Sequence, residues 1–245
     1  MSQGNPLFNE KAYQKTLEGY QLRVGEEMTL QGTINKSCFL LLLCLAGGVI
    51  GWNHIGSVFA HSMLIVLAAF IVALVIIFKK TTAPLLAPVY AVLEGLALGA
   101  ISAGYNQMYE GIVVQAVSIT ALVFALMLFL YKSGIIKVNR TFVLGVTAAT
   151  GAIALFYLIS LVLSLFGVQV PYFESTSGWA IAINAIICIV AALNFAIDFQ
   201  FINIMTQLPQ VPKYMEWYAG FSLLVTLVWV YIEILKLLGR SRSRR

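Results

Sequence analysis

The longest stretch of this chain without Asp, Glu, Lys or Arg covers residues 37–78 and reads SCFLLLLCLAGGVIGWNHIGSVFAHSMLIVLAAFIVALVIIF. A helical membrane span needs about 20 apolar residues to cross a hydrocarbon core roughly 30 Å thick. The stretch is long enough for two such spans, and the polar run at residues 53–57 divides it. It therefore predicts two successive membrane helices, at residues 34–52 and 58–78.

The composition of the whole chain points the same way. Of its 245 residues, 60% are hydrophobic and 10% are charged, whereas a soluble domain is about 45–50% apolar and about 25% charged. One soluble core cannot hide so many apolar side chains, so many of them must face lipid. This excludes a soluble enzyme, a disordered chain and a disulfide-stapled secreted domain. The net charge of +5 comes from loops and tails and forms no basic face for nucleic acid.

Five further windows with few charges follow residue 78. Only closed helices satisfy the backbone in lipid without strands, so we expect an all-α membrane protein, a seven-transmembrane-helix bundle with short loops. The expected spans are residues 34–52, 58–78, 84–104, 111–131, 143–166, 179–202 and 217–238. We expect a polar N-terminal segment at residues 1–33 and a basic C-terminal tail at residues 239–245.

Lys and Arg are distributed unevenly between the two sides of this bundle. Before residue 236, every Lys and Arg lies in the N-terminal segment or in loops on the same side of the membrane, and the opposite loops contain none. Cytoplasmic loops carry an excess of these residues, so the N-terminus is predicted to be cytoplasmic, in a cell (inner or plasma) membrane. The basic tail disagrees, because seven crossings place it outside. A re-entrant last segment is the alternative, but residues 217–238 are long and apolar enough to cross.

Glu94 lies within the third predicted span. It is about 15 Å along that helix at 1.5 Å per residue, near the middle of the bilayer. An ionisable residue at this depth is costly and is by default a functional candidate, here as an ion ligand or proton carrier. The alternative is a protonated glutamate packed inside the bundle. Beside it runs a row of small residues that allows another helix to approach closely. This row is Ala91, Gly95, Gly99 and Ala103.

Asp198 is the second acid, near the cytoplasmic end of the sixth span. On a helical wheel it shares one face with Asn184 and Asn194, so we expect a polar stripe directed into the bundle. The functional interpretation is an ion pathway or gate, and the alternative is an ion pair that joins two helix ends. The candidate gate partners on the same side of the membrane are Lys79, Lys80 and Glu216.

The remaining polar residues indicate no catalytic chemistry. Glu233 precedes Lys236 by three residues, which favours an interfacial ion pair. His54 and His61 have no nearby Cys or carboxylate cluster, so no metal site and no cofactor are expected. The sequence also lacks the residue pairs of intramembrane proteases, and Asp198 is its only Asp. We therefore expect a protein that is not an enzyme.

Several motifs together resemble the Bax inhibitor-1 (transmembrane BAX inhibitor motif) family, and especially its bacterial branch. They are EGLALGAIS at 94–102, YKSG at 131–134, ALNFAIDF at 192–199, YMEWY at 214–218 and WVYIEIL at 229–235. The resemblance implies seven helices with the last one central, and a calcium leak modulated by pH through two aspartates near the cytoplasmic side. The sixth-helix aspartate corresponds to Asp198. Its partner position, counted from Glu216, falls on Thr226, so a gate of two aspartates cannot exist here.

Two functions follow from these observations. The first is a cation leak channel, with Ca²⁺ as the permeant ion and with Asp198, Glu94 and Thr226 along the pathway. Calcium prefers several oxygen ligands, and the amide carbonyls of Asn184 and Asn194 would add to them. The alternative is a non-conducting regulator that binds other membrane proteins, such as a quality-control protease or a stress-response partner. Its support is the long polar N-terminal segment and the basic tail. In both cases the lipid bilayer surrounds the protein.

Overall fold

The structure is a computed structural model that describes residues 27–168, 170, 172 and 175–244. Over these residues the chain is a bundle of helices, joined to one isolated bridge between Glu27 and Pro212. Most of the expected N-terminal segment, residues 1–26, lies outside the described part. The elements in chain order are α2 (Leu30–Asn53), α3 (Ile55–Ala60), α4 (Ser62–Phe78), the 3-10 turn η2 (Lys80–Thr82), α5 (Ala83–Met108), α6 (Ile112–Lys132), α7 (Arg140–Leu165), α9 (Gly178–Gln207) and α10 (Tyr214–Ser243).

The helices α2, α5, α6, α7, α9 and α10 are long and apolar enough to cross a membrane. The second expected span, residues 58–78, is instead divided between α3 and α4 at His61. The His61 N–H makes the ordinary helical bond to the Ser57 carbonyl at 3.2 Å, and the His61 ring Nδ1 contacts the same oxygen at 2.8 Å. The ring therefore competes with the backbone for this carbonyl. The remaining α4 has 17 residues, the lower limit for a span. Seven full spans are therefore not confirmed, although the helical membrane bundle is.

Several helices extend beyond their expected ends. Helix α2 begins at Leu30 because the Thr29 hydroxyl accepts a hydrogen bond from the Gly32 N–H at 2.9 Å, which satisfies a free donor of the first turn. Helix α9 continues to Gln207. Helix α10 continues to Ser243, so most of the expected basic tail is part of the last helix.

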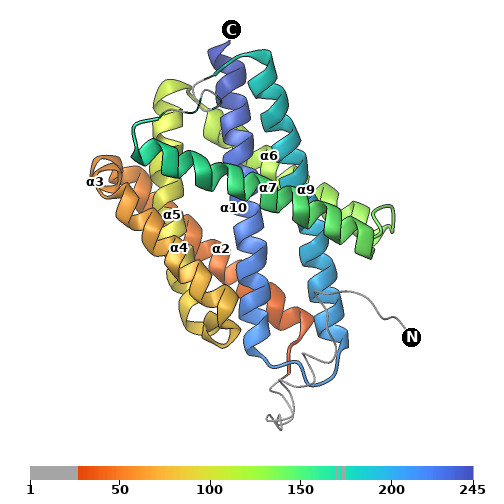
Figure 1. The fold of residues 1–245 in the computed structure, drawn as a ribbon. Coiled ribbons are helices and arrows are strands. Elements are labelled where there is room, and N and C mark those ends of the chain that lie inside the picture. The colour runs from red at the N-terminus through yellow and green to blue at the C-terminus, as the bar shows by residue number, and fades with distance from the viewer. Residues whose placement is uncertain (1–26, 169, 171, 173–174, 245) are drawn as a thin grey trace.

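Helix α10 runs through the middle of the bundle, as Figure 1 shows. It packs against α2, α5, α6 and α9, and half of its most apolar window is buried, the largest share among the six long helices. A helix surrounded by other helices has few side chains in contact with lipid, so its polar residues find protein partners. The expectation that the last helix is central is confirmed.

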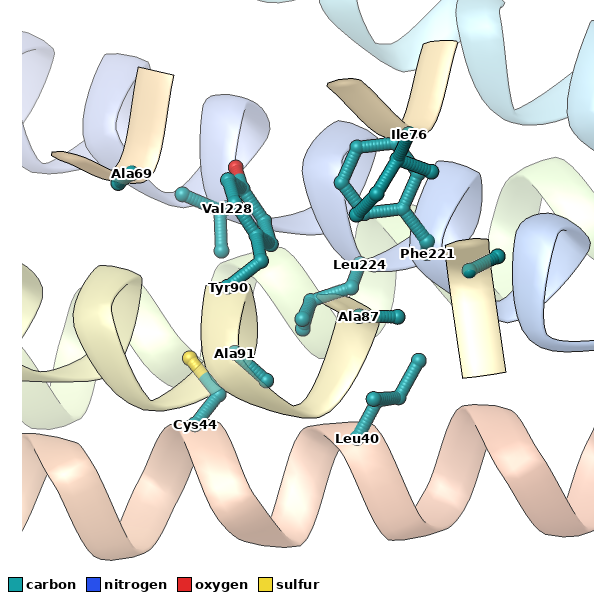
Figure 2. Packing of buried hydrophobic residues seen from close by; sticks show 11 residues of the cluster. Leu40, Cys44, Ala69, Ile76, Ala87, Tyr90, Ala91, Phe221, Leu224 and Val228 are labelled. Atoms are coloured by element: carbon teal, nitrogen blue, oxygen red, sulfur yellow. The ribbon is translucent and has the colours of Figure 1, made fainter. Parts of the chain in front are cut away.

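Helices α2 and α5 approach so closely that their backbones touch. A Cβ added to Gly95 would collide with the Cys44 carbonyl, and one added to Gly99 would collide with the Gly48 carbonyl. The expected close approach along the row of small residues is therefore confirmed. Next to this seam, a cluster of buried residues joins α2, α4, α5 and α10 (Figure 2). In it the ring of Tyr90 packs edge-on against Phe221, with ring centroids 4.9 Å apart.

Candidate functional site

Asp198 is buried on α9 and faces α10. The Ser222 hydroxyl donates to its Oδ1 at 2.6 Å, and the Thr226 hydroxyl donates to its Oδ2 at 2.6 Å. These distances are typical of hydrogen bonds to an ionised carboxylate. Ser222 and Thr226 are four residues apart and so lie on one face of α10. The central helix therefore presents one hydroxyl to each oxygen of a single acid.

Thr226 occupies the position at which the resemblance places the second aspartate. The structure brings it into direct contact with Asp198. A threonine at this position supplies a hydroxyl where an aspartate would supply a second carboxylate. The site thus has one acid and two hydroxyl donors, and its charge changes by one proton at most.

Glu94 lies on the wall of a cavity of about 520 Å³ between α4, α5 and α10. Tyr90 lies one helical turn before it on the same wall, and Tyr218 and Ser222 contribute from α10. The rest of the lining is apolar and consists of Val66, Ala69, Phe70, Ala73, Ile77, Phe221 and Val225. The cavity therefore collects a carboxylate and three hydroxyl groups within an apolar wall.

Ser222 connects the cavity with the buried acid. Ser222 lines the cavity, and its hydroxyl donates a hydrogen bond to Asp198. Ser222 on α10 therefore shares a cavity with Glu94 of α5 and a hydrogen bond with Asp198 of α9. Carboxylate and hydroxyl oxygens are ligands that hard cations accept.

The two asparagines of the expected polar stripe do not join Asp198. The Asn194 amide donates to the Thr150 hydroxyl on α7 at 2.9 Å and to the Val190 carbonyl at 2.8 Å. Asn184 is buried and donates to the carboxylate of Glu233 at 2.8 Å. The three polar residues of the expected stripe therefore bind different partners: Asn194 binds α7, Asn184 binds Glu233, and Asp198 binds the two hydroxyls of α10. They do not form one continuous polar path.

The three candidate gate partners lie near the N-terminal end of α10 but do not pair with Asp198. Lys80 is exposed, and its Nζ lies 5.1 Å from the centroid of the Tyr218 ring, which brings a cation to a residue of the cavity wall. Lys79 is exposed. Glu216 is fully buried and accepts hydrogen bonds from the Thr29 N–H and hydroxyl at 3.0 and 2.9 Å. Within the described residues, no Lys or Arg forms an ion pair with Asp198.

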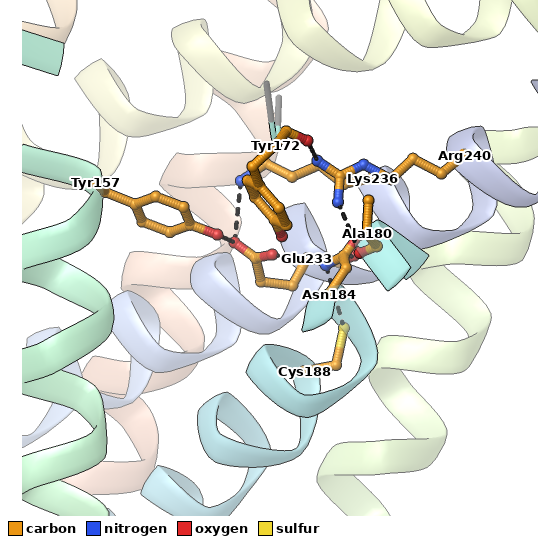
Figure 3. A network of polar contacts seen from close by, with 8 residues as sticks. All are labelled: Tyr157, Tyr172, Ala180, Asn184, Cys188, Glu233, Lys236 and Arg240. Atoms are coloured by element: carbon orange, nitrogen blue, oxygen red, sulfur yellow. Dashed lines mark hydrogen bonds and ion pairs between the residues drawn. The ribbon is translucent and has the colours of Figure 1, made fainter. Parts of the chain in front are cut away.

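A second polar network lies nearer the C-terminal end of α10 (Figure 3). The Glu233 carboxylate accepts from Tyr157 at 2.9 Å and from Asn184 at 2.8 Å, and it pairs with Lys236 at 3.0 Å. The expected ion pair with Lys236 is confirmed. Glu233 is only 1% exposed, so the pair lies against the interior of the bundle. The network ties α7 and α9 to the central helix.

Arg240 extends this network, although the sequence pattern placed it in a tail. Its guanidinium donates to the Ala180 carbonyl at 3.1 Å and to the Tyr172 carbonyl at 2.9 Å, and it lies 4.2 Å from the centroid of the Tyr172 ring. Burial raises the pKa of the Tyr172 hydroxyl, and Arg240 acts against this shift. The sequence did contain a signal that Arg240 belongs to the last helix: Glu233, Lys236 and Arg240 are three and four residues apart, and this spacing places them on one face of a helix.

The comparisons with known proteins concern the whole chain. A protein-family model described as Bax inhibitor 1 like matches residues 5–243, which is nearly the full length. This match confirms the resemblance drawn from the motifs. A search of curated proteins found no match.

Proposed function

Because the chain belongs to the Bax inhibitor 1 like family and forms a multi-pass helical membrane bundle, we propose that it is a cation leak channel with Ca²⁺ as its permeant ion. The proposal is of a transport protein and not of an enzyme. The membrane we propose is the bacterial inner membrane. One observation supports the proposal above the others: Glu94 and Ser222 border the same cavity, and the Ser222 hydroxyl donates to Asp198.

The role proposed for Glu94 is to attract a cation into the cavity. Two unit charges 4 Å apart interact by about 4 kcal/mol at an effective dielectric constant of 20. Within an otherwise apolar wall, the carboxylate offsets part of the cost of removing water from the ion. The hydroxyls of Tyr90, Tyr218 and Ser222 would complete the set of oxygen ligands.

The role proposed for Asp198 is to make the leak depend on pH. The ionised carboxylate accepts hydrogen bonds from both hydroxyls on α10. A protonated carboxyl must donate from one of its oxygens, so one of those bonds has to break or reverse. The groups that face Asp198 are Ser222, Thr226 and the nearby Tyr218. Protonation would therefore loosen the contact between α9 and the central helix, which borders the cavity.

The orientation proposed has the N-terminus in the cytoplasm. Lys36 lies 5.2 Å from the centroid of the Trp217 ring, and Lys80 lies against Tyr218, so basic residues from two segments gather at the start of α10. The excess of Lys and Arg at this end supports a cytoplasmic position. At the other end of α10, Arg240 and Arg242 are hydrogen-bonded to loop carbonyls.

A non-conducting regulator is the second function. It is favoured by the contacts that fix the end of the N-terminal segment to the start of the central helix. The Met28 N–H donates to the Val211 carbonyl at 2.7 Å, and Thr29 is bonded to Glu216. The polar residues before Met28 therefore begin beside the connection between α9 and α10, where a protein bound to them would act directly on the central helix.

The experiment that tests the leak is Ca²⁺ flux into liposomes that contain the purified full-length protein. We expect Glu94→Gln to lower the flux at least tenfold, because a tenfold change corresponds to about 1.4 kcal/mol, well below the attraction worked out above. We expect Asp198→Asn to abolish the response of the flux to pH between mildly acidic and mildly alkaline buffers. The control is Glu110→Gln, which neutralises an exposed acid outside the cavity.

The leak proposal fails if both cavity variants conduct like the wild type, or if the wild type conducts no more than empty liposomes. Deletion of residues 1–27 separates the second function from the first. A truncated chain that still conducts but loses its regulatory effect in cells supports the regulator.

A further inference from the structure

A second cavity, of about 450 Å³, lies between α2, α5, α6 and α10 and plays no part in the proposed leak. It shares no lining residue with the cavity of Glu94. We call it the α2–α6 groove. Its lining is mostly aliphatic and consists of Leu41, Cys44, Leu45, Gly48, Val49, Trp52, Asn53, Leu98, Gly99, Ser102, Val113, Val117, Thr120, Ala121, Leu227, Val228 and Tyr231.

The three hydroxyl groups of the groove lining are already hydrogen-bonded within the protein. Ser102 and Tyr231 share a hydrogen bond of 2.6 Å between α5 and α10, and the Thr120 hydroxyl donates to the Ala116 carbonyl at 2.7 Å. A cavity holds ordered water when it offers polar partners, whereas an apolar cavity stays dry and takes up apolar ligands. The groove therefore suits a hydrocarbon and not an ion.

The groove is as deep as one leaflet of a bilayer. Along α2 its lining runs from Leu41 to Asn53, a rise of about 18 Å at 1.5 Å per residue. Half of the hydrocarbon core is about 15 Å thick. Trp52 and Asn53 end the groove at the last turn of α2, and Trp is typical of the membrane interface. The groove thus leads from the interface to the middle of the membrane.

The groove is open to the lipid that surrounds the bundle. Helices α2 and α6 form its two sides, and each of them packs against both α5 and α10. Leu45 and Val49 on the α2 side are 56% and 62% exposed, so they form a rim and not a closed wall. The bilayer supplies a ligand of matching length and polarity at this rim.

We propose that the α2–α6 groove binds one acyl chain of a membrane phospholipid, from the leaflet that lies at the C-terminal end of α2. The head group would lie at the level of Trp52 and Asn53, and the chain would extend along α2 towards Leu41. Binding would fill the space between α2 and α6 and hold both against the central helix. The residues that line this groove are different from those of the proposed leak. The lipid site and the leak can therefore be tested separately.

The test is native mass spectrometry of the full-length protein, extracted in mild detergent and supplied with a phosphatidylethanolamine that carries a photoactivatable acyl chain. We expect one lipid per chain to remain bound, and we expect cross-links on residues of the groove. Gly48→Phe should reduce the bound fraction at least tenfold. The nearest atom to a Cβ at Gly48 is 3.7 Å away, an ordinary van der Waals contact, so the Cβ itself is accommodated at this lining position.

The matched control is Leu42→Phe, on the same helix but outside the groove and 65% exposed; it should bind lipid like the wild type. Ala121→Phe fills the groove from the α6 side and replaces Gly48→Phe if that variant does not fold. The proposal is overturned if a folded, filled variant retains the lipid, if cross-links fall outside the groove, or if the wild type carries no lipid and instead appears as a dimer through this face.

Discussion

Gly95→Ala is the substitution that most sharply tests the packing of α2 against α5. The added Cβ would overlap the backbone carbonyl of Cys44, which cannot rotate away because it belongs to α2. Relief requires the two helices to separate by about 1 Å, which forfeits a quarter to a half of the dispersion energy of each contact along the seam. Overpacking of this kind costs about 1–3 kcal/mol, and we expect the free energy of unfolding of Gly95→Ala to fall by this amount below that of a glycine-to-alanine change elsewhere on the same helix.

The assay is reversible unfolding by a denaturing detergent, followed by circular dichroism and compared with wild type. Gly104→Ala is the matched control, because it lies on the same helix with no atom within 4 Å of the new Cβ. Alanine favours a helix over glycine by about 1 kcal/mol, so this control should be unchanged or more stable. Equal stability of the two variants would refute the close approach of α2 and α5.

Three further substitutions test the polar contacts of α10. Thr226→Val leaves a buried oxygen of Asp198 without its hydrogen-bond donor and should lower the free energy of unfolding by about 1–3 kcal/mol. Thr226→Ser keeps the hydroxyl and should keep the stability of the wild type. Equal stability of all three proteins would contradict the contact. Glu216→Ala frees the Thr29 N–H, so hydrogen exchange in the first turn of α2 should rise about tenfold or more, and unchanged protection there would argue against the bond. Arg240→Met removes the donor to the Tyr172 loop carbonyl and to the Ala180 carbonyl in the first turn of α9. It should lower stability by about 2 kcal/mol or more, with the more exposed Arg242→Met as the milder comparison.

The helices were predictable because lipid imposes a strong constraint on sequence. Apolar windows with few charges located six of the seven expected spans, and the row with Gly95 and Gly99 predicted a close helix contact that the structure contains. The window at residues 58–78 is free of charge as well, but the helix is interrupted at His61, where the ring and the backbone N–H compete for the Ser57 carbonyl. A hydropathy pattern cannot predict that one side chain will compete for a backbone carbonyl and interrupt a helix.

The partners of the polar residues were harder to predict. A helical wheel places Asn194 close in angle to Asp198, but α9 lies between α7 and α10. A small difference in angle therefore directs Asn194 to Thr150 and Asp198 to Thr226. Arg240 was assigned to the tail by charge alone. Carbonyl groups at helix ends and in loops need donors, and a sequence does not reveal which loop folds within reach.

Access of a cation to the cavity beside Glu94 is the most direct test of the central claim. The measurement is the rate at which a cationic methanethiosulfonate modifies Val225→Cys, a position on the cavity wall, after the native cysteines are replaced by alanine. We predict rapid modification that Ca²⁺ slows, and loss of that protection when Glu94→Gln is added. Modification no faster than that of the lipid-facing control Leu122→Cys, or no effect of Ca²⁺, would contradict the account.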